Sequence, residues 1–224
     1  MRFCKCERGA KGQAYWKRKA TETHQRKLTD LFANAGIPPR YQDLTIDTLV
    51  AQAGDDPAKK AAIAAAAEFV DNGYCIDPVD GRKRAGIILT GDYGVGKTGL
   101  LTPVLRAYLE QGQSGMWVES LDFLREIQRG YGDGSSDAKL DVVRTAGIIL
   151  LDDLGAGAAA TETDDKQRII YDLIKHRHYH MLPTLITTNL SVNELVLKLG
   201  ERTAQRILEL CLWVKMGGRN LRGI

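Results

Sequence analysis

The segment Gly86-Ile87-Ile88-Leu89-Thr90-Gly91-Asp92-Tyr93-Gly94-Val95-Gly96-Lys97-Thr98 decides the fold of this chain. Its first five residues predict a short strand, its centre matches the pattern G-x-x-x-x-G-K-T, and the residues after it favour a helix. A loop in this position can direct several backbone N–H groups at phosphate oxygens, because glycines permit the necessary backbone angles and a close approach. The positive end of the following helix adds to the attraction of an anion. The segment therefore predicts a phosphate-binding loop.

Two side chains of this loop have specific predicted roles. Lys97 is expected to reach the β- and γ-phosphates of a nucleotide, and the hydroxyl of Thr98 is expected to bind Mg²⁺. The predicted nucleotide-binding residues are Gly91, Asp92, Tyr93, Gly94, Val95, Gly96, Lys97, Thr98 and Gly99. The predicted ligands are therefore ATP and Mg²⁺.

Apolar runs and helical segments alternate along the rest of the chain. The predicted strands are 86–90, 115–118, 148–151, 185–187 and 212–215. The predicted helices are 57–72, 98–111, 121–129, 164–180 and 192–199. Alternating strands and helices indicate a parallel sheet that is covered on both faces, and continuously apolar strands agree with that. We therefore predict an α/β fold of the P-loop class, with a parallel sheet of about five strands flanked by helices.

Polar side chains follow the third and fourth predicted strands. Because ligands of open α/β sheets bind at the carboxyl ends of strands, Asp152 is expected beside the phosphate loop, where it would hold Mg²⁺. Asp153 is predicted to polarise the attacking water, although many sites of this kind have the longer Glu at that position. Asn189 follows the fourth strand and is predicted to orient this water; as a lone feature it could equally be a helix N-cap, as could Ser191.

Two arginines near the C-terminus are four residues apart. Arg202 and Arg206 are therefore expected on one face of a helix. An arginine suits a γ-phosphate because its guanidinium is planar and always charged. When a neighbouring subunit supplies it, such a residue can raise hydrolysis by roughly 10³–10⁵. From the spacing alone, a surface helix on which Glu201 pairs with an arginine is the simpler explanation.

The 224 residues carry a formal net charge of +3, but the charge is distributed unevenly. Residues 1–40 contain ten basic and three acidic residues, a net charge of +7, and a predicted helix at 14–32 that Gly36 and two prolines end. We therefore predict a basic N-terminal arm over residues 1–40 and an ATPase domain over residues 41–224. Such an arm is typical of contact with a polyanion or an acidic partner, although a solvated helical tail has the same composition.

Targeting signals are not visible in the sequence. No apolar run approaches the roughly 20 residues that a membrane span needs, and the first residues are charged. Four cysteines in a chain of this length do not form a disulfide framework. We therefore expect a cytoplasmic protein without membrane contact.

Several of these motifs, in this order, resemble the AAA+ ATPases of the DnaC/DnaI helicase-loader and IstB-like group. The matching stretches are Ala35-Gly36-Ile37-Pro38-Pro39-Arg40-Tyr41, Gly91–Thr98, Leu151-Asp152-Asp153-Leu154-Gly155, Thr187-Thr188-Asn189, and Gly200-Glu201-Arg202 followed by Arg206. The resemblance implies that Asn189 is the sensor-1 residue and Arg206 an arginine finger that acts in trans within a homo-oligomer, with Arg202 as the second choice. It also implies that the full C-terminal helical lid of larger AAA+ proteins is absent.

The resemblance extends to partners. In this family an extra helical insertion helps to line a pore that holds single-stranded DNA, and the segment after the predicted helix 121–129 matches it. Arg129, Tyr131 and Lys139 are then DNA-contact candidates, since a ring can stack on a base and cations can contact phosphates. Cys4 and Cys6 resemble half of a loader-type zinc module, but two cysteines cannot complete a four-ligand zinc site.

Three functions are compatible with these features. The resemblance implies an ATP-hydrolysing DNA replication protein that loads a hexameric replicative helicase and binds single-stranded DNA. The alternative is an IstB-like transposition helper that acts on duplex DNA and recruits a transposase. A P-loop kinase for a small metabolite would also need an acceptor pocket and an arginine-bearing lid, which the sequence does not show. The basic, cysteine-bearing arm favours the loader.

Overall fold

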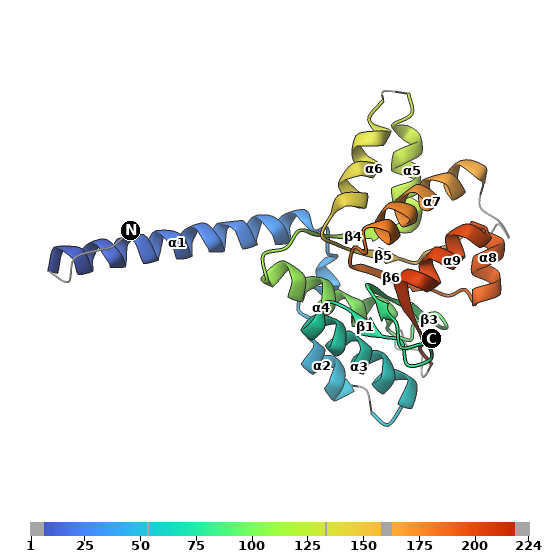
Figure 1. Cartoon of the computed structure of the whole chain (residues 1–224), viewed down its shortest axis with the longest axis horizontal. Helices are drawn as coiled ribbons and strands as arrows, with labels where there is room; N and C mark the ends of the chain where they lie inside the picture. Colours follow the sequence, from blue (N-terminus) through green and yellow to red (C-terminus); the bar gives the residue numbers. More distant parts are fainter. Residues whose placement is uncertain (1–6, 53, 133, 158–162, 218–224) are drawn as a thin grey trace.

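The computed structural model describes residues 7–217, apart from 53, 133 and 158–162, and its centre is a parallel β-sheet (Figure 1). The strands of this sheet are β3 (Gly86–Thr90), β4 (Gly115–Glu119), β5 (Ile148–Asp152), β6 (Thr184–Thr188) and β7 (Cys211–Lys215). They pair in the order β4-β5-β6-β3-β7, and every pairing is parallel. The predicted parallel sheet of about five strands is therefore confirmed.

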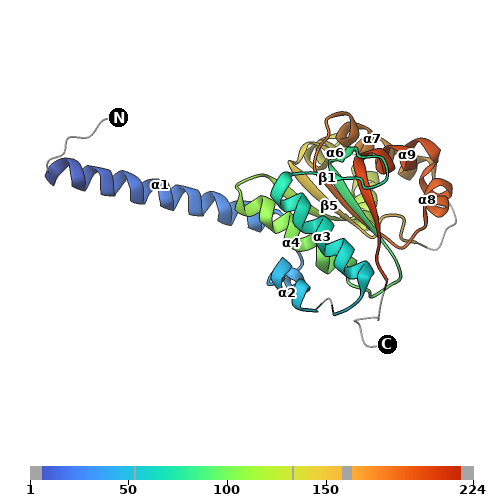
Figure 2. The same ribbon diagram turned by 60° about the horizontal axis from the view of Figure 1, so that its bottom comes forward.

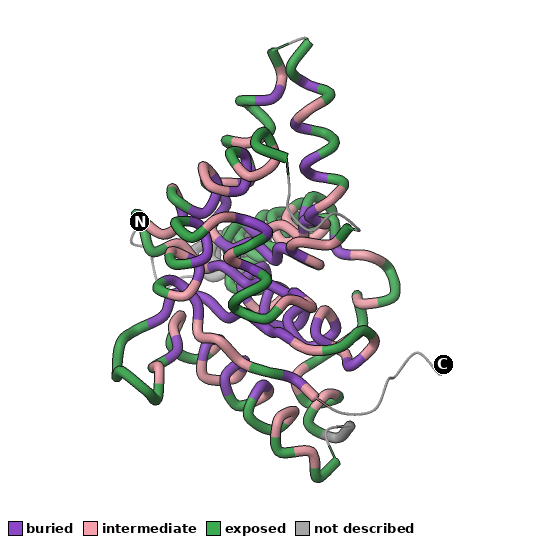
Figure 3. The backbone as a smooth tube through the Cα atoms, turned by 90° about the vertical axis from the view of Figure 1, so that its right-hand side faces the viewer, coloured by how far each residue is buried: buried purple, intermediate pink, exposed green. Residues whose placement is uncertain are grey.

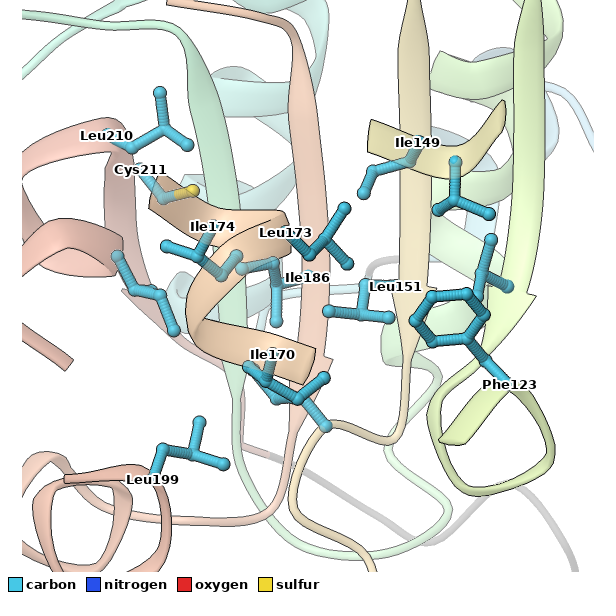
Figure 4. Packing of buried hydrophobic residues seen from close by; sticks show 14 of the residues in the cluster. Phe123, Ile149, Leu151, Ile170, Leu173, Ile174, Ile186, Leu199, Leu210 and Cys211 are labelled. Atoms are coloured by element: carbon cyan, nitrogen blue, oxygen red, sulfur yellow. The ribbon is translucent and has the colours of Figure 1, made fainter. Parts of the chain in front are cut away.

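Helices cover both faces of the sheet, so its three central strands are buried throughout. One face is covered by α3 (Pro57–Asn72) and α4 (Lys97–Glu110); the other by α5 (Ser120–Arg129), α6 (Ser136–Thr145), α7 (Asp164–Tyr179), α8 (Val192–Leu199) and α9 (Glu201–Leu210). Successive side chains of a strand point into different cores. Ile87 belongs to the core formed with α3 and α4, whereas Ile88 belongs to the core formed with α7 and α9. Figure 4 shows part of this second core, including Ile170 and Ile186. The buried residues accordingly follow the sheet and the inner sides of the helices (Figure 3).

The close approach of β3 and β6 depends on a glycine. Gly86 is in register with Thr184, and a Cβ at Gly86 would lie 2.1 Å from the Thr184 carbonyl oxygen. No larger residue fits there without moving a strand, and a shift of β3 would displace the loop that follows it.

The N-terminal helix α1 (Glu7–Asn34) extends beyond the predicted 14–32 and projects from the core (Figures 1 and 2). Residues 16–27 are exposed. In contrast, Leu31 and Phe32 pack against the core that contains α4, and the N–H of Trp117 in β4 donates to the Ala35 carbonyl oxygen at 2.7 Å. The projecting part is therefore the part before Leu31. Cys4 and Cys6 lie outside the described residues.

Several short elements were not predicted. They are η1 (Pro39–Tyr41), α2 (Ile46–Gln52) and a hairpin of β1 (Cys75–Ile76) and β2 (Lys83–Arg84). Arg84 makes ion pairs with Asp77 at 2.8 Å and with Asp80 at 2.6 Å, and it donates to the Glu209 carbonyl oxygen at 3.0 Å. These contacts anchor the hairpin to the end of α9. Across the described residues, no helix is long and apolar enough to cross a membrane.

Candidate nucleotide-binding site

The phosphate loop connects β3 to α4, as the sequence predicts. Gly91, Gly94 and Gly96 have φ values of 147°, 81° and 99°, in the left-handed region that favours glycine. A Cβ at Gly91 would lie 2.1 Å from the carbonyl oxygen of Met216. Gly96 is the N-cap of α4, so the unpaired N–H groups of the first helical turn follow directly after the loop.

Lys97 joins the phosphate loop to the end of β6. Its ammonium group donates to the carbonyl oxygens of Gly91 at 2.7 Å and Asp92 at 2.9 Å, and to Oδ1 of Asn189 at 2.6 Å. The side chain is buried. Ser191, rather than Asn189, is the N-cap of α8 and forms a capping box with Glu194. The Asn189 side chain therefore faces the phosphate loop, where the sequence predicts it.

Asp152 lies behind the loop, at the carboxyl end of β5. Its Oδ1 accepts hydrogen bonds from the hydroxyls of Thr98 at 2.7 Å and Thr187 at 2.6 Å. Burial raises the pKa of the Asp152 carboxyl, while the two hydroxyl donors oppose that shift. A hydroxyl and a carboxylate side by side provide the hard oxygen ligands that Mg²⁺ prefers. The residues present therefore fit the predicted metal site of Thr98 and Asp152.

Asp153 has an unusual backbone conformation, with φ at 52°. Few residues other than glycine adopt this left-handed geometry, although Asp tolerates it better than most. The N–H of Asp153 donates to the hydroxyl of Thr187 at 2.9 Å, which holds the turn in place. The result is that Asp152 stays behind the loop while Asp153 lines the cavity in front of it. Thr187 supports both acids, a role that the sequence analysis did not assign.

A cavity of about 320 Å³ adjoins the phosphate loop. Its phosphate end is lined by Tyr93, Gly94, Val95, Gly96, Lys97, Thr98, Gly99, Asp153 and Asn189. Gly91 and Asp92 contribute carbonyl groups to Lys97 instead of lining the cavity. The loop, Asp153 and Asn189 therefore meet at one cavity, as the sequence predicts.

The far end of the cavity was missed by the sequence analysis. It is lined by Arg40, Tyr41, Leu44, Leu49, Lys59, Ile63, Leu100 and Met216. These residues come from η1, the loop between η1 and α2, α2, α3, α4 and the segment after β7. The guanidinium of Arg40 lies over the Tyr41 ring at 4.6 Å. An apolar end beside a phosphate loop can accommodate the base of a nucleotide. Tyr41, the aromatic residue after Pro-Pro-Arg, was the feature of the sequence that could have indicated this end of the cavity.

The two predicted arginines lie elsewhere, on α9. Arg206 is half-buried, its guanidinium stacks over the ring of Tyr171 in α7 at 4.9 Å, and its Nη1 donates to the Arg202 carbonyl oxygen at 3.1 Å. Both arginines line a separate cleft with His178, Gln205 and Glu209. Neither arginine lines the phosphate cavity of its own chain. Each could therefore contact a γ-phosphate only in the nucleotide site of another copy of the chain.

The three DNA-contact candidates lie at the outer end of the α5–α6 hairpin, which projects from the sheet (Figure 1). Arg129 ends α5, Tyr131 follows it, and Lys139 is in the second turn of α6; all three are exposed. The nearby Tyr131 raises the pKa of the Arg168 guanidinium in α7. The candidates therefore share one exposed projection, away from the phosphate loop.

Comparison with known proteins agrees with this geometry. The family model described as "IstB-like ATP binding protein" matches residues 15–222. The chain belongs to the IstB-like ATP-binding family. Its phosphate loop and five-stranded parallel sheet are thus those of an ATP-binding AAA+ protein.

Two replicative helicase loaders are among the proteins to which this chain is similar. The replicative helicase loader DnaI of Bacillus subtilis (strain 168) is 32% identical over 152 residues, covering 62% of this chain and 48% of DnaI. The loader DnaC of Escherichia coli (strain K12) is 25% identical over 196 residues, covering 86% of this chain and 75% of DnaC. A crystal structure of the DnaC helicase loader superposes with a TM-score of 0.67 at 25% identity, covering 80% of this chain and all of that one. The chain matches about half the length of DnaI.

Asp152→Asn is expected to separate stability from ligand binding in this IstB-like chain. Because burial raises the pKa of Asp152 in the folded state above its unfolded-state value, the ligand-free fold loses stability as the pH rises from the unfolded-state pKa to the folded-state pKa, and above that the charged carboxylate remains a net cost. An asparagine removes the charge and keeps an oxygen for Thr98 and Thr187. We expect a higher thermal unfolding midpoint at pH 7 without ligand, and loss of the further stabilisation by Mg²⁺ with ATP.

Asp122→Asn is the matched control, because Asp122 is an exposed acid on α5. It should change neither the unfolding midpoint nor its response to Mg²⁺ with ATP. A ligand-free Asp152→Asn protein that unfolds earlier than the wild type, or that responds fully to Mg²⁺ with ATP, would contradict these assignments.

Proposed function

We propose that this chain is an ATPase that acts as a loader of a replicative DNA helicase and engages single-stranded DNA as part of a homo-oligomer. The observation that carries the ATPase proposal is the convergence of three strand ends. Lys97 after β3 contacts Asn189 after β6 at 2.6 Å, and Thr98 contacts Asp152 of β5 at 2.7 Å. Lys97, Thr98 and Asn189 thus line one cavity, and Asp152 contacts Thr98 from behind the phosphate loop.

The chain supplies four groups for hydrolysis. Thr98 and Asp152 are the residues that would hold Mg²⁺, and bound Mg²⁺ would offset the negative charge of the phosphates. Lys97 would exchange its carbonyl partners for phosphate oxygens, which attract a cation more strongly. Asp153, which lines the cavity, would accept a proton from the attacking water. The Asn189 amide uses Oδ1 for Lys97, so its NH₂ group remains to orient that water.

The choice of a loader over a transposition helper rests on the relatives and on the arm. DnaI and DnaC are named as helicase loaders, and the match to DnaC covers most of both chains. Residues 16–30 of the arm are exposed almost throughout and carry five basic and two acidic residues. A projecting, charged helix without a packed apolar face is suited to contact with a partner. The match to the IstB-like family model supports the alternative function. In that alternative, the chain is an IstB-like helper that recruits a transposase.

Co-purification with a replicative helicase and with an IS21-type transposase tests this proposal. We expect the helicase to be retained and the transposase not. Deletion of residues 1–26 should reduce helicase retention by at least about tenfold and leave ATP hydrolysis intact. The deletion ends at residue 26 because Leu31, Phe32 and Ala35 belong to the core.

An unchanged thermal unfolding midpoint of the shortened protein is the control for its fold. Helicase retention that survives the deletion would show that the arm is not the docking element. Retention of the transposase alone, with ATP hydrolysis stimulated by duplex and not by single-stranded DNA, would establish the transposition helper instead.

A further inference from the structure

Arg206 is held by an aromatic ring and not by a carboxylate. Its guanidinium carbon lies 4.9 Å from the centre of the Tyr171 ring, within the range of a cation–π interaction. Glu209, one turn further along α9, accepts instead from His178 at 2.9 Å and from Gln205 at 3.4 Å. Within the described part of the chain, no acid makes an ion pair with Arg206, so its positive charge is not neutralised.

Tyr171 lies on α7 beside the contact of this helix with α9. It is half-buried on α7, next to Ile170, which is fully buried in the core shared with Ile207 of α9. α7 and α9 pack against each other along this core, shown in Figure 4. Lys175, one turn further along α7, is the other cation near the ring, at 5.8 Å, and so lies further from it than Arg206. The ring therefore lies beside the α7–α9 contact, and Arg206 is the nearer of the two cations.

We propose that Tyr171 is a positioning residue that holds the Arg206 guanidinium ready for the nucleotide of a neighbouring copy of this chain. This inference rests on the proposed role of Arg206 in trans. The stacked ring occupies a face of the guanidinium, and the Arg202 carbonyl takes one N–H of Nη1. The remaining N–H groups lie in the guanidinium plane, where they can donate to phosphate oxygens in a forked arrangement.

The Tyr171 ring acts through conformational entropy. A free arginine side chain loses rotamer freedom when it is immobilised. Contacts with Tyr171 and with the α9 backbone restrict those rotamers before subunits meet, so less freedom is lost when the guanidinium reaches a phosphate. A neutral ring suits this task better than a carboxylate, which would compete with the phosphate for the same N–H groups.

Steady-state ATP hydrolysis of the assembled protein tests this inference. Tyr171→Leu removes the ring face and is expected to lower kcat by about fivefold to tenfold, the size of a partly desolvated cation–π interaction, without changing KM for ATP. Tyr171→Phe keeps the face and loses only the hydroxyl, so it should retain more than about half of the wild-type kcat. In the background of Arg206→Ala, Tyr171→Leu should cause no further loss, because the two residues act as a unit.

The same series separates this inference from the proposed function. If Arg206→Ala leaves kcat unchanged, the trans arginine itself is wrong and the role of Tyr171 falls with it. If Arg206→Ala lowers kcat but Tyr171→Leu does not, or if Tyr171→Phe is as impaired as Tyr171→Leu, only the positioning role is overturned. Tyr171→Met, which is flexible and lacks a ring, replaces Tyr171→Leu should that protein fail to match the wild-type unfolding midpoint.

Discussion

Replacement of Lys97 by alanine is expected to lower ATP turnover by at least about 10²-fold, the size of effect seen when one charge-stabilising donor is removed from an active site. Lys97 is the buried cation of the phosphate loop, and its three acceptors lie in the loop and at the end of β6. Without it, the loop loses the charge that compensates the phosphates and the link that places Asn189. Release of inorganic phosphate by the purified protein, at saturating ATP and Mg²⁺, measures the effect.

Lys60→Ala is the matched control. Lys60 is an exposed lysine of α3 that makes only a surface ion pair with Asp55 at 3.0 Å, and such pairs contribute little. Its replacement should leave turnover unchanged. If the Lys97→Ala protein turned over ATP within twofold of the control, Lys97 would not be part of the nucleotide site.

Arg206→Ala is expected to lower turnover by roughly 10³-fold or more, as the loss of an arginine finger does, and to leave ATP affinity nearly unchanged. We expect ATP affinity to be retained because Arg206 does not line the phosphate cavity of its own chain. Arg202→Ala is the comparison, since Arg202 is on the same helix and is exposed. A large loss with Arg202→Ala and none with Arg206→Ala would exchange the two assignments.

Mixing two inactive proteins tests the action in trans directly. The Lys97→Ala protein keeps Arg206, and the Arg206→Ala protein keeps an intact phosphate loop. Mixed assemblies should regain turnover, because one subunit supplies the arginine and its neighbour the nucleotide site. Wild-type turnover per chain that stays constant on dilution to the monomer would contradict a contribution from a second copy.

The sequence predicted those parts of the site that depend on local order along the chain. The strand, glycine loop and helix around Lys97 lie together in sequence, so their geometry follows from residue types alone. Asp152, Asp153 and Asn189 could be placed because the carboxyl ends of parallel strands share one edge. Asn189 remained ambiguous until the capping box of Ser191 was seen, because both residues are good helix caps.

The remainder depends on contacts between distant segments, for which one sequence holds little signal. Ile63 reaches the cavity through α3 and belongs to no motif that predicts base contact, and Tyr41 of η1 could have been suspected only from its position after Pro-Pro-Arg. The hairpin of β1 and β2 was missed because its strands are two residues each, although Asp80-Gly81 is a turn signal. Tyr171 and Arg206 are 35 positions apart in the sequence, on two different helices, and no spacing rule predicts their contact.

The most direct test of the account is a calorimetric titration of the full chain with ATP in the presence of Mg²⁺. The account predicts association at one nucleotide per chain that weakens when Mg²⁺ is withheld and is lost in the Lys97→Ala protein. A folded wild-type chain that shows no heat of association with adenine nucleotides and Mg²⁺, at any temperature where it remains folded, would contradict it.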